Sequence, residues 1–377
     1  MTDSVTFWAV RNAFLVLVLA SSCTPDKGNN PPPLASEDPV CPTGAVFTAS
    51  PVDPAQIDEV FGIGTFGAPG HVIPNEHGGI WVQGKDVPFL APSAGRISTL
   101  RRTVFTRSSW RQGEADYAIS FRPCAGQESV FGHVASLSPE LEALVGSGDC
   151  SSYDTDSETV ESCNVQVSIK VQAGQQLGTV GGDTNRGFDW GHHVDTHVNH
   201  FANPSRLAPP VLHAVCPYDG YEGLLRDTLY AKIKRTGEPR CGTLELDKEG
   251  TAQGIWVDKA NQANQGGDER MFVTLGPNYD SPDLAQRLAL APASLGGAQV
   301  DVPISHDGRK NRAFNEVAAD GTVFCYVAQD AVVSFFLALS SAGELRIERV
   351  PHGLGASPCD GDPAAWNVSS AATTLVR

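Results

Sequence analysis

Nine cysteines constrain this chain more than any other feature of its sequence. They stand at positions 23, 41, 124, 150, 163, 216, 241, 325 and 359, and no two of them form a Cys-x-x-Cys pair. Zinc ribbons and thioredoxin-like sites use such pairs, so disulfide bonds in an oxidising compartment are the simpler interpretation. Nearest-neighbour order among the last eight predicts Cys150–Cys163, Cys216–Cys241 and Cys325–Cys359, with Cys41–Cys124 left over.

The N-terminus predicts export to such a compartment. Arg11 precedes an apolar run over residues 13–20, and small residues then lead directly to Cys23. This is the layout of a secretory signal. The cysteine after the small residues resembles the lipobox of bacterial lipoproteins, which implies cleavage before Cys23 and a diacylglycerol on its thiol. The alternative is a plain signal peptide or an uncleaved anchor. A spanning helix needs about 20 apolar residues, and Arg11 and Asn12 interrupt this run.

Composition indicates how the exported chain is held. We expect a signal peptide over residues 1–22 and a disordered tether over residues 23–40, because the latter stretch is dense in Pro, Asn and Asp. The formal net charge of -16 argues against a nucleic-acid partner and against electrostatic docking on anionic lipid. The lipid anchor is therefore the expected attachment to the membrane. The predicted location is the cell envelope, on the periplasmic side or at the cell surface.

Short β-type runs predict a mainly β fold. VQVSIKV, MFVTL, TVFCYV and ELRIERV are examples, and they alternate with turns in a chain with 38 glycines and 26 prolines. Apolar residues at helical spacing predict a short helix in a connector over residues 206–240. Residues 241–377 are expected to form five or six antiparallel strands in a small barrel or sandwich, with turns at residues 248–250, 320–321 and 342–343.

Residues 60–205 contain an ordered series of glycine-rich hairpins and histidine-bearing segments. The series runs GAPGHVIPNEHGGIWV, VPFLAPSAGRIS, VFGHVASLSPEL, VQVSIKVQAGQQLGTVGG and FDWGHHVDTHV. APSAGRI is typical of a turn followed by a strand, and VQAGQQLGTVGG of a strand–turn–strand in which Leu177 and Val180 return to a core. The succession resembles the lysostaphin-type zinc endopeptidases. For residues 41–205 that resemblance implies a duplicated hybrid-motif, or barrel-sandwich, domain that binds one zinc ion.

The resemblance also implies roles for individual residues. His133, in FGHV, matches the catalytic histidine of the family's Y-x-H-L element, and His193 matches the catalytic position of its closing H-x-H. Asp195 then replaces the last metal ligand. The first ligand is His71 if H-V-I-P-N stands for the family's H-x-x-x-D, or His77 in an alignment that places Trp81 at the aspartate. The implied metal set is therefore His71, His77 and Asp195.

Two functions remain open on these residues. Because two of the three ligand positions have changed, the domain is expected to be degenerate and to bind cell wall or an envelope protein. The alternative is an active zinc endopeptidase that cuts peptidoglycan or surface peptides. The sequence is also similar to uncharacterised relatives with G-H-x-x-P-x-x-H, F-G-H and D-x-G elements. That similarity implies a variant site formed by His71, Pro74, His77, His133, Asp189 and Asp195.

Overall fold

The fold is mainly β, as the sequence predicts. The computed structural model describes residues 38–377 except 68–69, 109–111, 147, 155–157, 183–184 and 262–268. The predicted signal peptide, Cys23 and most of the predicted tether lie outside the described residues. Within the described part, no helix is long and apolar enough to cross a bilayer.

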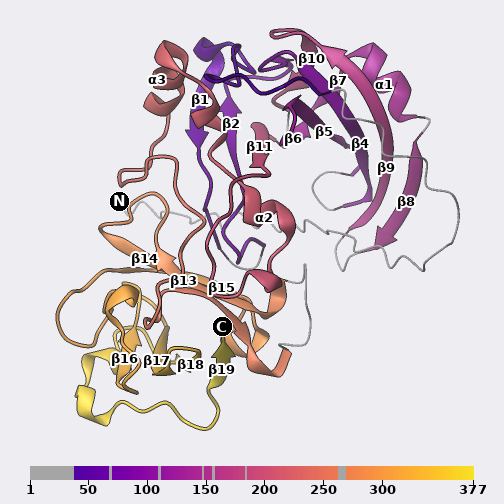
Figure 1. Cartoon of the computed structure of the whole chain (residues 1–377). Coiled ribbons are helices and arrows are strands. Elements are labelled where there is room, and N and C mark those ends of the chain that lie inside the picture. Colours follow the sequence, from indigo (N-terminus) through magenta and orange to yellow (C-terminus); the bar gives the residue numbers. More distant parts are fainter. Residues whose placement is uncertain are drawn as a thin grey trace, which may run out of the picture.

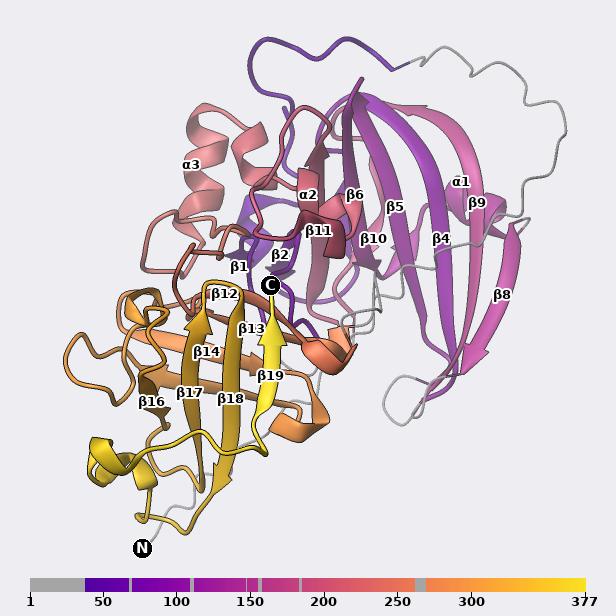
Figure 2. The ribbon, with the colours of Figure 1, turned by 60° about the horizontal axis from the view of Figure 1, so that its bottom comes forward.

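Two antiparallel sheets form the first domain. The larger has the order β1 (Ile57–Phe61), β2 (His77–Val82), β11 (Gly187–Val194), β6 (Gln127–Val134), β5 (Ala115–Cys124), β4 (Gly95–Arg107), β9 (Thr159–Val171) and β8 (Asp149–Asp154). The smaller has the order β3 (Val87–Leu90), β10 (Gln176–Val180) and β7 (Ser136–Leu137), and α1 (Pro139–Val145) follows it. Figure 2 shows β4, β5, β9 and β8 side by side as long curved strands. Both sheets contribute to one hydrophobic core.

The predicted hairpins are present in this domain. APSAGRI leads from β3 into β4, and VQAGQQLGTVGG joins β9 to β10. Leu177 and Val180 are buried, as the pattern requires. The centre of the core is aromatic: Trp190 is fully buried, and its ring lies 5.3 Å from that of Phe131 and 5.1 Å from that of Phe47. Such clusters supply much of the apolar burial that stabilises a domain.

The predicted connector contains the expected helix but belongs to the first core. Helices α2 (Pro209–His213) and α3 (Gly223–Ala231) lie in this stretch. Tyr218, Tyr221 and Leu229 are buried in the same core as β2 and β11. The Tyr218 hydroxyl donates to the carbonyl oxygens of Phe61 at 3.0 Å and Gly79 at 2.8 Å. Residues 206–240 therefore brace the strands of the first domain rather than merely linking two units.

The C-terminal domain is one antiparallel sheet of eight strands, more than the five or six expected (Figure 1). Its order is β15 (Ala298–Pro303), β14 (Ala285–Leu290), β13 (Phe272–Pro277), β12 (Gly254–Asp258), β19 (Thr373–Val376), β18 (Glu344–Pro351), β17 (Val333–Ser341) and β16 (Val323–Tyr326). The turn at residues 342–343 joins β17 to β18 as predicted. The other two turns do not join strands. Residues 241–253 are all described, and they form one isolated β-bridge but no strand. Residues 320–321 follow a 3-10 helix and not a strand.

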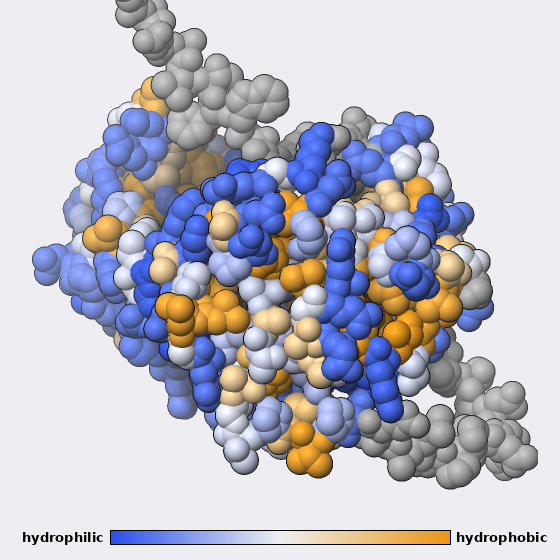
Figure 3. All heavy atoms as spheres, turned by 90° about the horizontal axis from the view of Figure 1, so that it is seen from above, coloured by the Kyte–Doolittle hydropathy of each residue, from blue (hydrophilic) through white to orange (hydrophobic). Residues whose placement is uncertain are grey.

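All four predicted disulfides are present: Cys41–Cys124, Cys150–Cys163, Cys216–Cys241 and Cys325–Cys359. The first three lie within the first domain or at its end, and the fourth lies in the C-terminal domain. On the face seen in Figure 3, apolar side chains form separate patches among hydrophilic ones.

Candidate functional site

The candidate site lies on one face of four neighbouring strands, β2, β11, β6 and β5. Side chains alternate between the two faces of a strand. Ile80 of β2 and Trp190 of β11 point into the core and are fully buried. His77 and Asp189 have the opposite parity on the same strands, so both project from the other face. The site therefore stands on the outer side of the aromatic core.

Glycines keep the middle of this face open. Asp189 stands between Gly79 of β2 and Gly132 of β6, and His77 is paired with Gly191 of β11. A Cβ atom on Gly132 would lie 3.6 Å from the Asp189 Cβ. A Cβ atom on Gly191 would lie 3.4 Å from the ring of His193. The missing side chains leave room around the Asp189 carboxylate for imidazole rings from both sides.

A β-bulge brings His133 onto this face. Ile119 pairs with Phe131 and Tyr117 pairs with Val134, so β6 holds one residue more than β5 over the same length. Phe131 and Val134 both reach the core. The extra residue is accommodated by the left-handed backbone of His133, whose φ is 60°. Bulges of this kind change the direction of a side chain. Non-glycine residues with left-handed backbone are often found at functional sites.

His133 lies between two carboxylates. Its Nδ1 donates to Asp116 Oδ2 at 2.7 Å, and its Nε2 donates to Asp189 Oδ2 at 3.3 Å. Burial alone would lower the pKa of His133, but the two hydrogen bonds and the two negative charges raise it to about 10. Burial likewise opposes ionisation of Asp189, yet His77 and His133 hold its pKa at about 2. At neutral pH the group is a carboxylate–imidazolium–carboxylate triad with a net charge of one unit negative.

His71 and His77 complete the cluster. The two rings are edge to face with centroids 5.9 Å apart, and His77 Nδ1 lies 3.8 Å from Asp189 Oδ2. Burial, reinforced by the neighbouring His77, lowers the pKa of His71 to about 4. Glu76 acts in the opposite direction on His71. His71 is therefore neutral at physiological pH, in the same cluster as the protonated His133.

The structure brings together His71, His77 and His133, with His193 at the edge of the cluster. The imidazole of His193 reaches over Gly191 toward His77. Burial lowers the pKa of His193, and its Nε2 has no hydrogen-bond partner among the described residues.

Asp195 does not join them. Its backbone amide binds the carbonyl oxygen of Gly126, at the opposite end of β6 from His133. The six residue-to-residue steps from Gly126 to Gly132 span roughly 20 Å of strand. The structure therefore does not bring Asp195 together with His71 and His77, and Asp189 supplies the carboxylate of the cluster.

Neither alignment of the H-x-x-x-D element supplies a carboxylate as second ligand. In one, Asn75 replaces the aspartate, but its side-chain amide donates to Thr65 Oγ1 at 3.0 Å. In the other, His77 and Trp81 stand four residues apart on the regular strand β2. Four residues of strand span roughly 13 Å, which is too far for two ligands of one ion.

The zinc ion implied by the sequence resemblance does not fit this arrangement. Zinc binds its ligands at about 2.0–2.2 Å, so the donor atoms of a tetrahedral site lie about 3.4 Å apart. The nitrogen at that distance from Asp189 is Nε2 of His133, and the other nitrogen of that ring already donates to Asp116. Across the described ranges of the chain, no group of three or more His, Cys, Asp or Glu side chains is placed to hold a metal ion.

Sequence reasoning did not single out Asp116, Glu76 or Glu269. Asp116 begins DYAISF, an ordinary strand sequence with no motif around it. Its role depends on the register between β5 and β6, which only the folded sheet reveals. Glu269 belongs to the other domain, and its carboxylate accepts from the backbone amide of Val72 at 2.5 Å. No local pattern in the sequence connects that residue to the site.

Comparisons with known proteins give a weak structural likeness. No family model matches the sequence, and no curated protein does. Among solved structures, the chain is similar to the antimicrobial peptidase lysostaphin from Staphylococcus simulans. The TM-score is 0.25 and the sequence identity is 14%, over 68% of this chain and 93% of that one. At this level of similarity the description of the site rests on its own geometry.

Proposed function

We propose that this chain is a lipid-anchored protein of the cell envelope whose first domain binds a cell-wall or protein ligand without zinc-dependent hydrolysis. The observation that carries the proposal is that the carboxylate of Asp189 is already paired with another side chain of the protein. Its carboxylate is paired with the protonated His133, which Asp116 holds from the other side. A zinc peptidase needs its ligands deprotonated and directed at the ion. Here the central acid and the central imidazole neutralise one another.

The charge of the cluster indicates the kind of ligand group it recognises. Asp116 and Asp189 contribute two negative charges and His133 contributes one positive charge. Glu76 adds a further carboxylate close enough to raise the pKa of both His71 and His193 against the effect of burial. An acidic, partly buried face of this kind attracts cations. The free amino groups of wall peptides, or lysine side chains of an envelope protein, have the required charge.

The test compares Asp189, which lies in β11, with Asp195, which directly follows the end of that strand. Binding of the purified protein to isolated peptidoglycan sacculi is measured by sedimentation for Asp189→Asn and Asp195→Asn. Asp189→Asn is expected to weaken binding at least tenfold, since it removes the central charge. Asp195→Asn is the matched control and is expected to bind as the unaltered protein does. Equal binding by all three proteins would refute a role for the cluster in wall binding.

Metal content separates this proposal from the zinc endopeptidase. Elemental analysis of the purified protein is expected to give far less than one zinc ion per chain. Stoichiometric zinc that is lost in Asp189→Asn, together with cleavage of wall peptides, would contradict the proposal and favour the peptidase. If the purified protein binds an envelope protein and not the sacculi, its ligand is a protein and not the cell wall.

A further inference from the structure

We propose that the C-terminal domain positions His71, so that the cluster is completed across the contact between the two domains. Glu269 is the principal positioning residue in this arrangement. The inference concerns how the site is assembled, and it holds whichever ligand the site binds.

The segment that carries His71 is buried against the C-terminal sheet rather than in the first core. It joins β1 to β2, and Phe66 and Val72 are its main apolar anchors, at 3% and 0% exposure. They belong to a separate hydrophobic cluster whose other buried members all come from the C-terminal domain: Leu246, Ile255, Val257, Met271, Phe272 and Ala289. Since Val72 directly follows His71, the second domain fixes the chain at the point where the imidazole emerges.

Polar contacts from the C-terminal domain hold the backbone on both sides of His71. On one side, Glu269 Oε2 accepts from the amides of Val72 at 2.5 Å and Ile73 at 3.4 Å. On the other side, Arg287 Nη1 donates to the carbonyl oxygen of Phe66 at 2.7 Å. Each of these side chains comes from a residue beyond the first domain. Charge-assisted hydrogen bonds to backbone groups are among the stronger ones in proteins.

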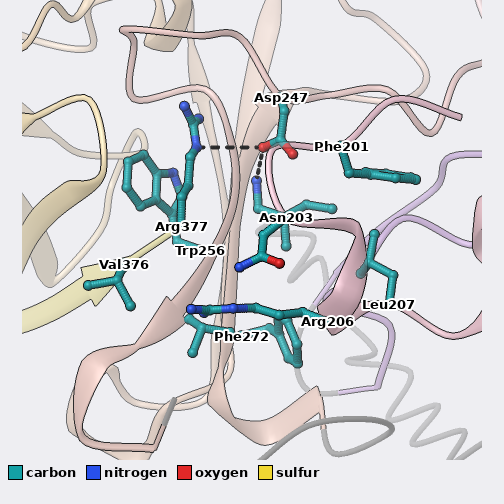
Figure 4. A pocket seen from close by; sticks show the side chains of 11 residues that line it. Phe201, Asn203, Arg206, Leu207, Asp247, Trp256, Phe272, Val376 and Arg377 are labelled. Carbon is teal, nitrogen blue, oxygen red and sulfur yellow. Dashed lines mark hydrogen bonds and ion pairs between the residues drawn. The ribbon is translucent and has the colours of Figure 1, made fainter. Parts of the chain in front are cut away.

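The same device holds a second segment of the first domain. Glu245 accepts from the amide of His200 at 2.7 Å, and Asp247 accepts from the amide of Ala202 at 2.9 Å. Figure 4 shows Asp247 between this segment and Arg377, whose guanidinium lies over the ring of Trp256 at 4.2 Å. Carboxylates of the C-terminal domain thus hold backbone amides of both segments that cross it.

Glu269 is held where an ionised carboxyl is unfavourable. Burial raises its pKa to about 7, and the amides of Val72 and Ile73 oppose that rise. A buried carboxyl is stabilised only when its oxygens find donors. The two amides beside His71 are those donors, so loss of the carboxyl leaves them unpaired in a buried place. The segment is then expected to move, and His71 with it.

The contact between the rings of His71 and His77 tests this inference. Nuclear Overhauser effects between the two rings are measured on protein with isotopically labelled histidine, in the presence of a chelator. The ring signals are assigned by loss in His71→Gln and His77→Gln. Glu269→Ala is expected to reduce the effect at least fivefold while the His133 signals keep their positions. Glu269→Gln is expected to retain at least half, because its amide oxygen still accepts one hydrogen bond.

The matched control is Glu344→Ala, which removes an acid of the same domain that pairs with Lys259 at the surface. It is expected to leave the effect unchanged. A wild-type intensity in folded Glu269→Ala would overturn the inference. If that variant does not fold, hydrogen exchange of the unaltered protein decides. The amides of Val72 and Ile73 should exchange as slowly as that of Phe272 in β13, and rapid exchange would overturn the proposal.

Discussion

Replacing Asp116 by Asn tests whether His133 is an imidazolium held between two carboxylates. The pKa of His133 is raised from 6.5 to about 10. At 1.36 kcal/mol per pKa unit, a rise of that size corresponds to at most about 5 kcal/mol of folding stability. Asp116 makes the shorter contact, 2.7 Å against 3.3 Å for Asp189. We assign it about half of that limit, so Asp116→Asn is expected to cost about 2–3 kcal/mol at pH 6.

The dependence on pH has a definite sign. A group whose pKa is higher in the folded state stabilises the fold fully below its unfolded pKa of 6.5, and this contribution is lost as the pH rises toward the folded value. The difference between the native protein and Asp116→Asn is therefore largest at pH 6. It should disappear as the pH approaches about 10, where the wild-type imidazolium also loses its proton. A carboxyl group with a lowered pKa would give the opposite trend.

The assay is urea unfolding at a series of pH values between 6 and 10, with the disulfides intact. Glu316→Gln is the control, because Glu316 contacts His306 Nδ1 at the same 2.7 Å while the His306 side chain is 67% exposed. Exposed pairs contribute less than about 1 kcal/mol. A cost for Asp116→Asn below about 0.5 kcal/mol at pH 6, or one that is equal at pH 6 and pH 10, would refute the reasoning.

Three further predictions concern the fold and the anchor. Gly79→Ala should lower the unfolding free energy by about 1–3 kcal/mol, because its Cβ would lie 2.3 Å from a phenyl carbon of β1; Gly343→Ala, with nothing within 4 Å, should leave the urea midpoint unchanged. Replacing Cys216 and Cys241 together by Ser opens a loop with a sequence separation of 25 and should cost about 3 kcal/mol. Cys23→Ala should abolish labelling by radioactive palmitate and leave the protein soluble in the envelope. Persistent labelling would contradict the lipobox assignment.

The features that the sequence predicted correctly depend on residues close together in the chain. All four disulfides join cysteines that are consecutive in the sequence, and Cys41–Cys124 was predicted as the pair that remained. The hairpins around β3, β4, β9 and β10 follow from glycines between alternating runs, which are local patterns. The strand expected before β12 did not form. There Asp247 accepts from the amide of Ala202 in the first domain. A contact with another part of the fold thus takes the place of the strand pairing that the local pattern predicted.

The composition of the cluster depends on strand register, which local pattern does not reveal. Asp116, His133 and Asp189 come from three strands, and their contact requires both the pairing of β6 with β11 and the bulge at His133. A shift of β11 by one residue against β6 would turn Asp189 toward the core. The sequence indicated the histidines that lie in the cluster because they stand in recognisable segments. The similarity to uncharacterised relatives included Asp189, but it included Asp195 as well, so the sequence did not distinguish the acid that meets them.

The strand that supplies the acid explains why the linear motif was misleading. An H-x-x-x-D element read along β2 would place its acid at Trp81, at the far end of the strand from His77. The folded sheet instead places Asp189 of β11 opposite Gly79, midway between those two residues. The carboxylate thus occupies the centre of the face, although the neighbouring strand provides it. Trp81 remains on that face with 39% of its surface exposed. A ligand that pairs with Asp189 would therefore also reach the aromatic ring of Trp81. A site with an aspartate at position 81 would lack that ring.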